Sequence, residues 1–119
     1  DPITFYSDIL RHNPNMGRVH NNIAMAYAER GQMEHAIRHY QAAIALEDVY
    51  PESHHNLGQA YLQLGRVAEA KAEFERALMI QPQFFYAHLK LAEIYEREKN
   101  DAQARLHANA AQAILSSKK

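Results

Sequence analysis

The feature that most constrains this chain is a repeat of 34 residues, found by shifting the sequence against itself. No gap is needed, and an apolar residue, a small residue and a tyrosine recur at each step: Ile23, Leu57 and Leu91; Ala24, Gly58 and Ala92; Tyr27, Tyr61 and Tyr95. The second part of the unit repeats as well: Gly31 and Gly65; Ala36, Ala70 and Ala104; Tyr40 and Phe74; Ala43, Ala77 and Ala111. A fixed period of this length is typical of an array in which each small unit packs against its neighbours.

Within one unit the apolar residues follow a helical period twice. In residues 51–64 an apolar stripe recurs every three or four residues, as on one face of a helix, at His54, Leu57, Gly58, Tyr61 and Leu64. Gly65 then ends that helix, and Pro82 prevents the following helix from continuing beyond residue 80. The sequence therefore predicts an all-α fold with helices near residues 3–12, 17–30, 33–46, 51–64, 67–80, 85–98 and 101–115.

The period and these residues resemble the tetratricopeptide repeat (TPR) family over essentially the whole chain. The resemblance implies a right-handed α–α superhelix, a TPR solenoid of about seven antiparallel helices, in a single domain of residues 1–119. The same spacing continues backward into the first residues, which implies that the chain begins inside a repeat and is a piece of a longer protein. The expected units are the second helix of a truncated repeat followed by three full repeats: residues 1–16, 17–50, 51–84 and 85–118.

Three positions depart from the family pattern. Asp48 stands where the family usually has proline, so the turn after the first full repeat is expected to be less rigid. Lys99 replaces the corner glycine, and Asn100 and Asp101 beside it are expected to form the bend and to cap the last helix. Ala108 replaces the large ring that earlier repeats carry, so the last helix is expected to bury less.

Composition and charge limit the classes of partner. Hydrophobic residues make up 47% of the chain, enough for a core, and the formal net charge is -1. Because Lys and Arg are scattered among acids, neither nucleic acid nor an anionic membrane surface is an expected partner. The longest apolar run, residues 23–28, is far shorter than the ~20 residues that cross a bilayer. The absence of cysteine excludes disulfides and thiolate metal sites, and the compartment stays open, with the cytoplasm favoured.

In the TPR family the first helix of each pair lines the concave side of the superhelix. The resemblance therefore implies a peptide-binding concave face made of Asn21, Asn22, Met25, His55, Asn56, Gln59, Gln63, Tyr86, Lys90, Glu93 and Arg97, flanked by Arg18, Glu29 and Leu89. Asn22 and Asn56, one repeat apart, each offer a donor and an acceptor to the backbone of an extended peptide. The pair resembles the asparagine ladder of O-linked N-acetylglucosamine transferases, with Lys90 in third place. The alternative is that these asparagines are merely compatible with a helix.

A carboxylate clamp, the other known groove chemistry of the family, is expected to be incomplete. Such a clamp holds a C-terminal carboxylate with Lys, Asn and Arg and needs a basic cluster. The matching places hold Asn21, Met25, Asn56, Tyr86 and Lys90, of which only Asn56 fits fully and Lys90 in part. Binding of chaperone tails is therefore not expected.

The chain has eight histidines, but their pattern does not indicate a catalytic or metal site. His20, His54 and His88 are one repeat apart, about a helix diameter of ~10 Å, which is too far for one metal ion. We expect them to fill packing sites that aromatic rings take in other units. His35 and His39 lie four residues apart without a third ligand, so a solvated outer face is expected. Since no catalytic triad, paired acids or phosphate loop appears, we expect no enzyme activity, metal or cofactor.

Three functions remain. The leading hypothesis is a protein–protein interaction module or scaffold that binds a peptide segment of a partner in its concave groove. The second is the substrate-recruiting region of a larger, glycosyltransferase-like enzyme, membrane-anchored or soluble, suggested by the start inside a repeat and by the asparagine pair. The third is self-association as a homo-oligomer, because the half repeat lacks its partner helix and would expose an apolar edge formed by Phe5, Tyr6, Ile9 and Leu10.

Overall fold

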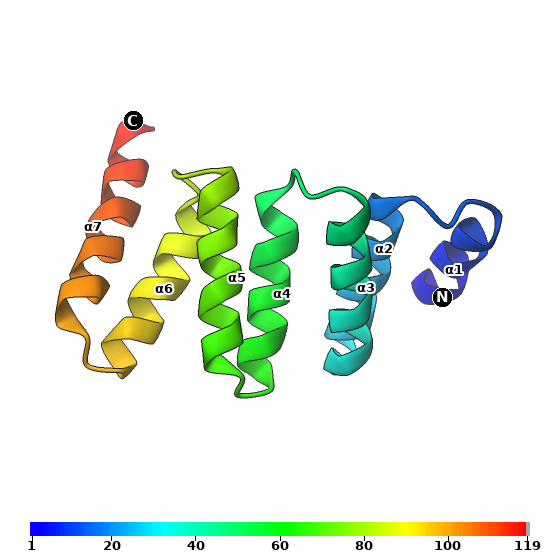
Figure 1. Ribbon diagram of the computed structural model, residues 1–119, viewed down its shortest axis with the longest axis horizontal. Helices are drawn as coiled ribbons and strands as arrows, with labels where there is room; N and C mark the ends of the chain where they lie inside the picture. Colours follow the sequence, from blue (N-terminus) through cyan, green and yellow to red (C-terminus); the bar gives the residue numbers. More distant parts are fainter. Residues whose placement is uncertain (119) are drawn as a thin grey trace.

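The computed structural model describes residues 1–118 and contains seven helices (Figure 1). They are α1 (Pro2–His12), α2 (Gly17–Glu29), α3 (Met33–Leu46), α4 (Pro51–Gln63), α5 (Val67–Ile80), α6 (Phe85–Arg97) and α7 (Asp101–Ser117). Each predicted helix is present, and its bounds differ by two residues at most from those expected. The all-α prediction is therefore confirmed, with no strand among the described residues.

The helices form a row of antiparallel hairpins rather than a closed bundle. Helix α2 pairs with α3, α4 with α5, and α6 with α7, while α3 packs on α4 and α5 packs on α6 (Figure 1). Helix α1 packs on α2 at one end of the row. The principal extents of 48 × 31 × 22 Å reflect this linear stacking, as expected for a right-handed α–α superhelix.

The corner inside each hairpin uses the same left-handed backbone. Gly31 and Gly65 have φ angles of 76° and 75°, in the region where a side chain is unfavourable. Lys99 takes the equivalent corner in the last hairpin with a φ angle of 60°. The Asn100 side chain then accepts a hydrogen bond of 3.3 Å from the Gln103 backbone N–H, which caps α7 as predicted.

The core consists of large rings set against small residues. The ring of Phe74 is completely buried, and Gly58 lies directly beneath it. A Cβ atom added at Gly58 would lie 2.8 Å from Cε1 of Phe74, which is closer than packed atoms can approach. Ala36 and Ala70, the small residues that recur at one position of the second helices, are also fully buried.

Both ends of the row bury less than its middle. Helix α1 contributes no buried residue, and Phe5 on it is 62% exposed. Helix α7 buries three residues only, His107, Ala111 and Ile114, although it is the longest helix of the described chain. Ala108 lies exposed on α7, so the prediction that the last helix buries less is confirmed.

A histidine near the start of each repeat joins the preceding turn to the second helix of the same repeat. In the last repeat, His88 donates from Nε2 to the Pro82 carbonyl at 2.8 Å, and its Nδ1 lies 2.9 Å from Nδ1 of His107. The first repeat has the same arrangement, at 3.2 Å for both contacts, formed by His20, Pro14 and His39. We call these contacts the histidine bridges.

The histidine bridge of the middle repeat keeps the geometry but changes the chemistry. Here Nε2 of His54 donates to the Asp48 carboxylate at 2.6 Å, and Nδ1 donates to the Glu73 carboxylate at 2.7 Å. Burial alone lowers the pKa of His54, but the hydrogen bonds to Glu73 and Asp48 outweigh it, so the pKa is raised. Glu73 is buried and also accepts a hydrogen bond from Arg76.

The histidine bridges correct three expectations. The repeating histidines do not simply fill packing sites, because both ring nitrogens of each one have a polar partner. Asp48 does not merely loosen the turn that it occupies, since its carboxylate binds His54 on α4. His35 is exposed as expected, but His39 is half-buried and stacks on Tyr27 at 5.6 Å, so it does not lie on a solvated face.

Candidate functional site

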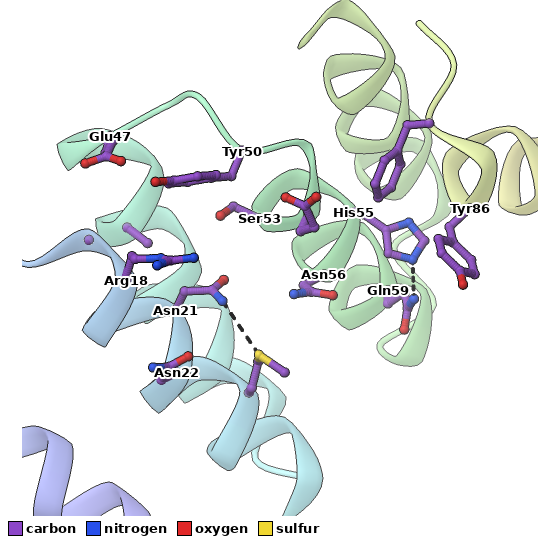
Figure 2. Close-up of a pocket in the computed structure, with 15 residues that line it drawn as sticks. Arg18, Asn21, Asn22, Glu47, Tyr50, Ser53, His55, Asn56, Gln59 and Tyr86 are labelled. Atoms are coloured by element: carbon purple, nitrogen blue, oxygen red, sulfur yellow. Dashed lines mark hydrogen bonds between the residues drawn. The ribbon is translucent and has the colours of Figure 1, made fainter. Parts of the chain in front are cut away.

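An open pocket of about 1030 Å³ lies between α2, α4 and the beginning of α6 (Figure 2). Its size matches the upper part of the range usual for ligand sites. The lining comes from one face of α2, from α4, from the end of α3 with the turn that follows it, and from Phe84 and Tyr86 at the start of α6. The lining residues are Gly17, Arg18, Asn21, Asn22, Met25, Ala43, Glu47, Tyr50, Glu52, Ser53, His55, Asn56, Gln59, Phe84 and Tyr86.

The structure brings together most of the residues predicted for the concave face. Seven of the predicted peptide-binding residues line the pocket with the flanking Arg18: Asn21, Asn22, Met25, His55, Asn56, Gln59 and Tyr86. Four others lie outside it: Gln63, Lys90, Glu93 and Arg97. Lys90 instead forms an ion pair of 3.7 Å with Glu93, one turn further along α6. The flanking Glu29 and Leu89 are also outside the pocket.

Sequence reasoning missed the contribution of the turns between repeats. Tyr50 and Phe84 immediately precede α4 and α6 and form part of the pocket wall. They are one repeat apart, and Met16 holds the equivalent place before α2. This recurrence of a large apolar residue at the start of each first helix is a signal that could have found them. Glu47 and Ser53, also in the lining, carry no such signal.

Three rings form the wall of the pocket nearest α6. The ring centroid of His55 lies 5.6 Å from that of Phe84 and 6.0 Å from that of Tyr86. Phe84 and Tyr86 are themselves 6.0 Å apart in an edge-to-face arrangement, a favourable geometry for aromatic pairs. His55 and Phe84 are buried, whereas Tyr86 is 59% exposed and available to a ligand.

Charges around the pocket are few and of both signs. Arg18 is the single cation of the lining, and its guanidinium lies 5.5 Å from the centre of the Tyr50 ring. Glu47 and Glu52 supply two carboxylates. A site that grips a carboxylate needs several converging cations, and this lining does not contain them.

Two asparagines in the lining keep their amide groups free of other side chains. Among residues 1–118, neither Asn22 nor Asn56 makes a side-chain hydrogen bond within the protein. Asn22 is exposed on α2, and Asn56 is half-buried one repeat further on α4 (Figure 2). Each therefore keeps one amide donor group and one carbonyl acceptor open toward the pocket.

Two other lining residues, Asn21 and His55, each make one side-chain hydrogen bond. Asn21 Nδ2 donates to the Met25 sulfur at 3.6 Å, and Gln59 Nε2 donates to His55 Nε2 at 2.5 Å (Figure 2). The buried atoms Asn21 Oδ1 and His55 Nδ1 have no partner in the described chain. Burial, followed by the nearby charge of Lys90, lowers the pKa of His55 to about 4, so this ring is neutral at physiological pH.

Residues 1–118 contain no group of three or more His, Asp or Glu side chains arranged to hold a metal ion. Every helix of this part of the chain is also too short or too polar to cross a lipid bilayer.

Comparisons with solved structures agree with the architecture. The crystal structure of MamA superposes with a TM-score of 0.93 at 22% identity, over 98% of this chain and 68% of that one. MamA 41-end from Desulfovibrio magneticus RS-1 gives a TM-score of 0.88 at 17% identity, over 98% and 66% of the two chains. This chain thus spans about two thirds of these MamA chains. At such identities the likeness shows the fold alone.

A third solved structure carries a ligand. The first TPR of Spaghetti (RPAP3), bound to the HSP90 peptide SRMEEVD, superposes with a TM-score of 0.77 at 27% identity. The matched region covers 82% of this chain and 77% of that one.

Among curated proteins, no relative of this chain is found.

Family models identify the repeats directly from the sequence. A model described as TPR repeat matches residues 24–65, and a model described as tetratricopeptide repeat matches residues 51–84. Together the two matches span residues 24–84, just over half of the chain. With the 34-residue period and the row of antiparallel hairpins, they show that this chain belongs to the tetratricopeptide repeat family.

Proposed function

We propose that this chain is a protein-interaction module that binds an extended segment of a partner polypeptide in the pocket between α2, α4 and α6. The observation that carries the proposal is the pair Asn22 and Asn56. Their amides line one open pocket, one repeat apart, and no other side chain occupies them. An extended peptide has an unpaired N–H and C=O at every residue, so it supplies the partners that these amides lack.

The comparisons support the same class of ligand. The RPAP3 TPR, which shares this fold, holds a peptide of HSP90. The pocket of this chain has a different lining, with one cation and two carboxylates. We therefore propose a peptide partner without adopting that particular ligand.

A selection from a library of linear peptides displayed on phage, carried out against the wild-type chain, tests the proposal. Peptides that bind in the pocket should bind the Asn22→Ala/Asn56→Ala variant about tenfold more weakly, since two hydrogen bonds are lost. Asn109→Ala, an exposed asparagine of α7 outside the pocket, should leave binding unchanged. Isothermal titration calorimetry measures both affinities. The absence of any selected peptide, or equal binding by the double variant, would refute the proposal.

Self-association is a second candidate, favoured by the exposure of Phe5 on a helix with no buried residue. Of the apolar edge predicted on α1, Phe5 alone is exposed, because Tyr6, Ile9 and Leu10 are half-buried. We propose that α1 pairs with a second copy of the chain through the Phe5 ring. Light scattering across a concentration series should then show a dimer for the wild type and a monomer for Phe5→Glu. A wild-type chain that stays monomeric throughout the series would exclude this role.

A further inference from the structure

The histidine bridge of the last repeat has a fixed arrangement of protons. A carbonyl oxygen can only accept, so Nε2 of His88 carries the proton that it donates to Pro82 at 2.8 Å. In a neutral His88 ring the other nitrogen, Nδ1, is then an acceptor, and it receives its hydrogen bond from Nδ1–H of His107 at 2.9 Å. Both rings are buried. A single proton therefore lies between the two histidines.

This bridge can take up one further proton, but not two. A first extra proton can bind Nε2 of His107, which lies outside the bridge, and the hydrogen bond between the rings remains. A second extra proton would place an N–H group on both facing nitrogens. Two donors and two like charges would then meet at 2.9 Å, so the rings of His88 and His107 must separate.

The charged groups around the bridge give a second cation little support. From α5, Glu75 favours the charged form of His107, but its carboxylate already accepts the Tyr95 hydroxyl at 3.4 Å. Lys71, also on α5, forms an ion pair of 2.9 Å with Glu98 at the end of α6. Burial, and then the charge of the neighbouring histidine, accordingly lower the pKa of His107.

The other side of the bridge borders an uncharged hollow. His88 lines a hollow of about 250 Å³ between α7 and the turn before α6. Its other lining residues within the described chain carry no charge: Pro82, Gln83, Ala110, Ala113, Ile114 and Ser117. No carboxylate of this lining can pair with a charged His88, and the hollow gives water a path to the ring once the bridge opens.

Helix α7 depends on this bridge more than the other second helices depend on theirs. Its buried residues are His107, Ala111 and Ile114, so one of its three anchors is a histidine of the bridge. The first repeat has a histidine pair as well, but α3 also buries the ring of Tyr40, and α5 buries the ring of Phe74. Opening of the bridge should therefore loosen α7 before any other second helix.

The bridge of the middle repeat responds to acid in the opposite direction. A charged His54 donates from both nitrogens to carboxylates, those of Asp48 and Glu73. Protonation of His54 therefore completes these hydrogen bonds rather than breaking them. The hairpin of α4 and α5 should stay closed under conditions in which the last bridge opens.

We propose that the histidine bridge of the last repeat is a pH-sensitive switch, which holds α7 on α6 at neutral pH and releases it in mild acid. Its stabilising contribution is present above pH 6.5, the ordinary value for histidine, and is lost as the pH falls. The face of α6 that α7 covers then becomes open. This switch goes beyond the proposed function and does not depend on what the pocket binds.

Hydrogen exchange of the backbone amides, followed by mass spectrometry, tests the switch in the whole chain. Between about pH 7 and about pH 5, the amides of α7 should lose about tenfold in protection after correction for the intrinsic exchange rate. The amides of α4 and α5 should keep theirs. Unchanged protection of α7, or an equal loss in α4 and α5, would overturn the proposal.

The variant His107→Glu places a carboxylate opposite His88, as Glu73 lies opposite His54 in the middle repeat. It should abolish the loss of α7 protection in acid. The control His12→Gln removes an exposed histidine of α1 and should lose protection as the wild type does. Acid release of α7 that persists in His107→Glu would overturn the switch.

If His107→Glu does not fold, the imidazole nitrogen-15 signals of the wild type decide the question. His88 and His107 should both become charged in the pH interval in which α7 loses its protection. Loss of protection while the pair still shares its proton, or two charged rings beneath a fully protected α7, would refute the role of the bridge.

Discussion

The middle repeat and the last repeat follow one sequence register but bury different chemistry. Helices α4 and α5 enclose the Phe74 ring above Gly58, whereas α6 and α7 have Ala92 and the exposed Ala108 at the equivalent places. The histidine bridges differ in the same two repeats. His54 lies between two carboxylates, while in the last repeat the bridging histidine contacts a proline carbonyl and a second histidine.

The difference shows that the repeat conserves a geometry rather than a charge state. Each bridge needs one donor toward the turn and one hydrogen bond to the second helix. Two carboxylates make His54 donate from both nitrogens, which favours its cation, and its pKa is raised. Burial, and then the neighbouring His88, lowers the pKa of His107. The partners within each histidine bridge therefore decide whether a histidine of that bridge favours its charged or its neutral form.

Removal of the Phe74 ring should produce the largest effect. Phe74→Ala is expected to lower the free energy of unfolding by about 3–5 kcal/mol, because a fully buried ring is lost and a cavity remains. Ala108→Ser, at the equivalent exposed place in the last repeat, should change it by less than about 0.5 kcal/mol. Urea denaturation followed by circular dichroism measures both. Equal losses in the two variants would remove the distinction between the repeats.

The second largest effect should come from removing the negative charge of Glu73 in the histidine bridge of the middle repeat. Glu73→Gln keeps an oxygen acceptor for His54 but removes the buried charge, and should cost about 2 kcal/mol. The control is His107→Gln, at the equivalent position of α7, which removes the hydrogen bond between His88 and His107 and should cost about 1 kcal/mol. Denaturation at pH 6.5 compares them, and a larger loss for His107→Gln would contradict the assignment of charge.

Adding a methyl group at Gly58 tests the close contact between Gly58 and Phe74 in the middle repeat. Gly58→Ala crowds Phe74 at a cost of about 1–3 kcal/mol, which the better helix propensity of alanine offsets by about 1 kcal/mol. The net loss should be about 1 kcal/mol. In a Phe74→Leu background the crowding is relieved, so the same substitution should become stabilising. If Gly58→Ala is equally unfavourable in both backgrounds, Phe74 is not the cause.

The pH dependence of stability should show the smallest effect and separate the two kinds of bridge. The pKa values of His39, His55 and His107 are lowered, so their contribution is present above pH 6.5 and is lost as the pH falls toward their folded values. The pKa of His54 is raised, so its contribution is complete below pH 6.5 and is lost as the pH rises through its folded value.

Unfolding free energy should therefore be greatest near pH 6.5 and fall by about 1 kcal/mol by pH 5.5. In Glu73→Gln the free energy of unfolding should fall less above pH 6.5, while its fall below pH 6.5 should be unchanged. Nuclear magnetic resonance titration of each imidazole provides the matching pKa values. A His54 pKa below that of His107 would reverse the comparison.

Much of the fold could be predicted because it depends on local pattern. Each first helix ends two residues before a corner of fixed backbone geometry, which is formed by Gly31, Gly65 and Lys99. Proline and small residues at repeating positions were also sufficient to predict the hairpins. Seven of the residues predicted for the concave face line one pocket, and their role in peptide binding stays a prediction, while Lys90 pairs with Glu93 and lies outside the pocket. Side-chain partners of this kind depend on rotamers and distances that a linear pattern does not contain.

The 34-residue period alone specified an open row of helical hairpins, because a unit that cannot bury its own apolar face must stack on the next one. The protonation of the bridging histidines and the polarity of the pocket were decided only by the folded chain. His54 and Glu73 are 19 residues apart in sequence, and 2.7 Å apart in space. Electrostatic interaction and hydrogen bonding depend on that second separation and on the exclusion of water, which tertiary packing creates.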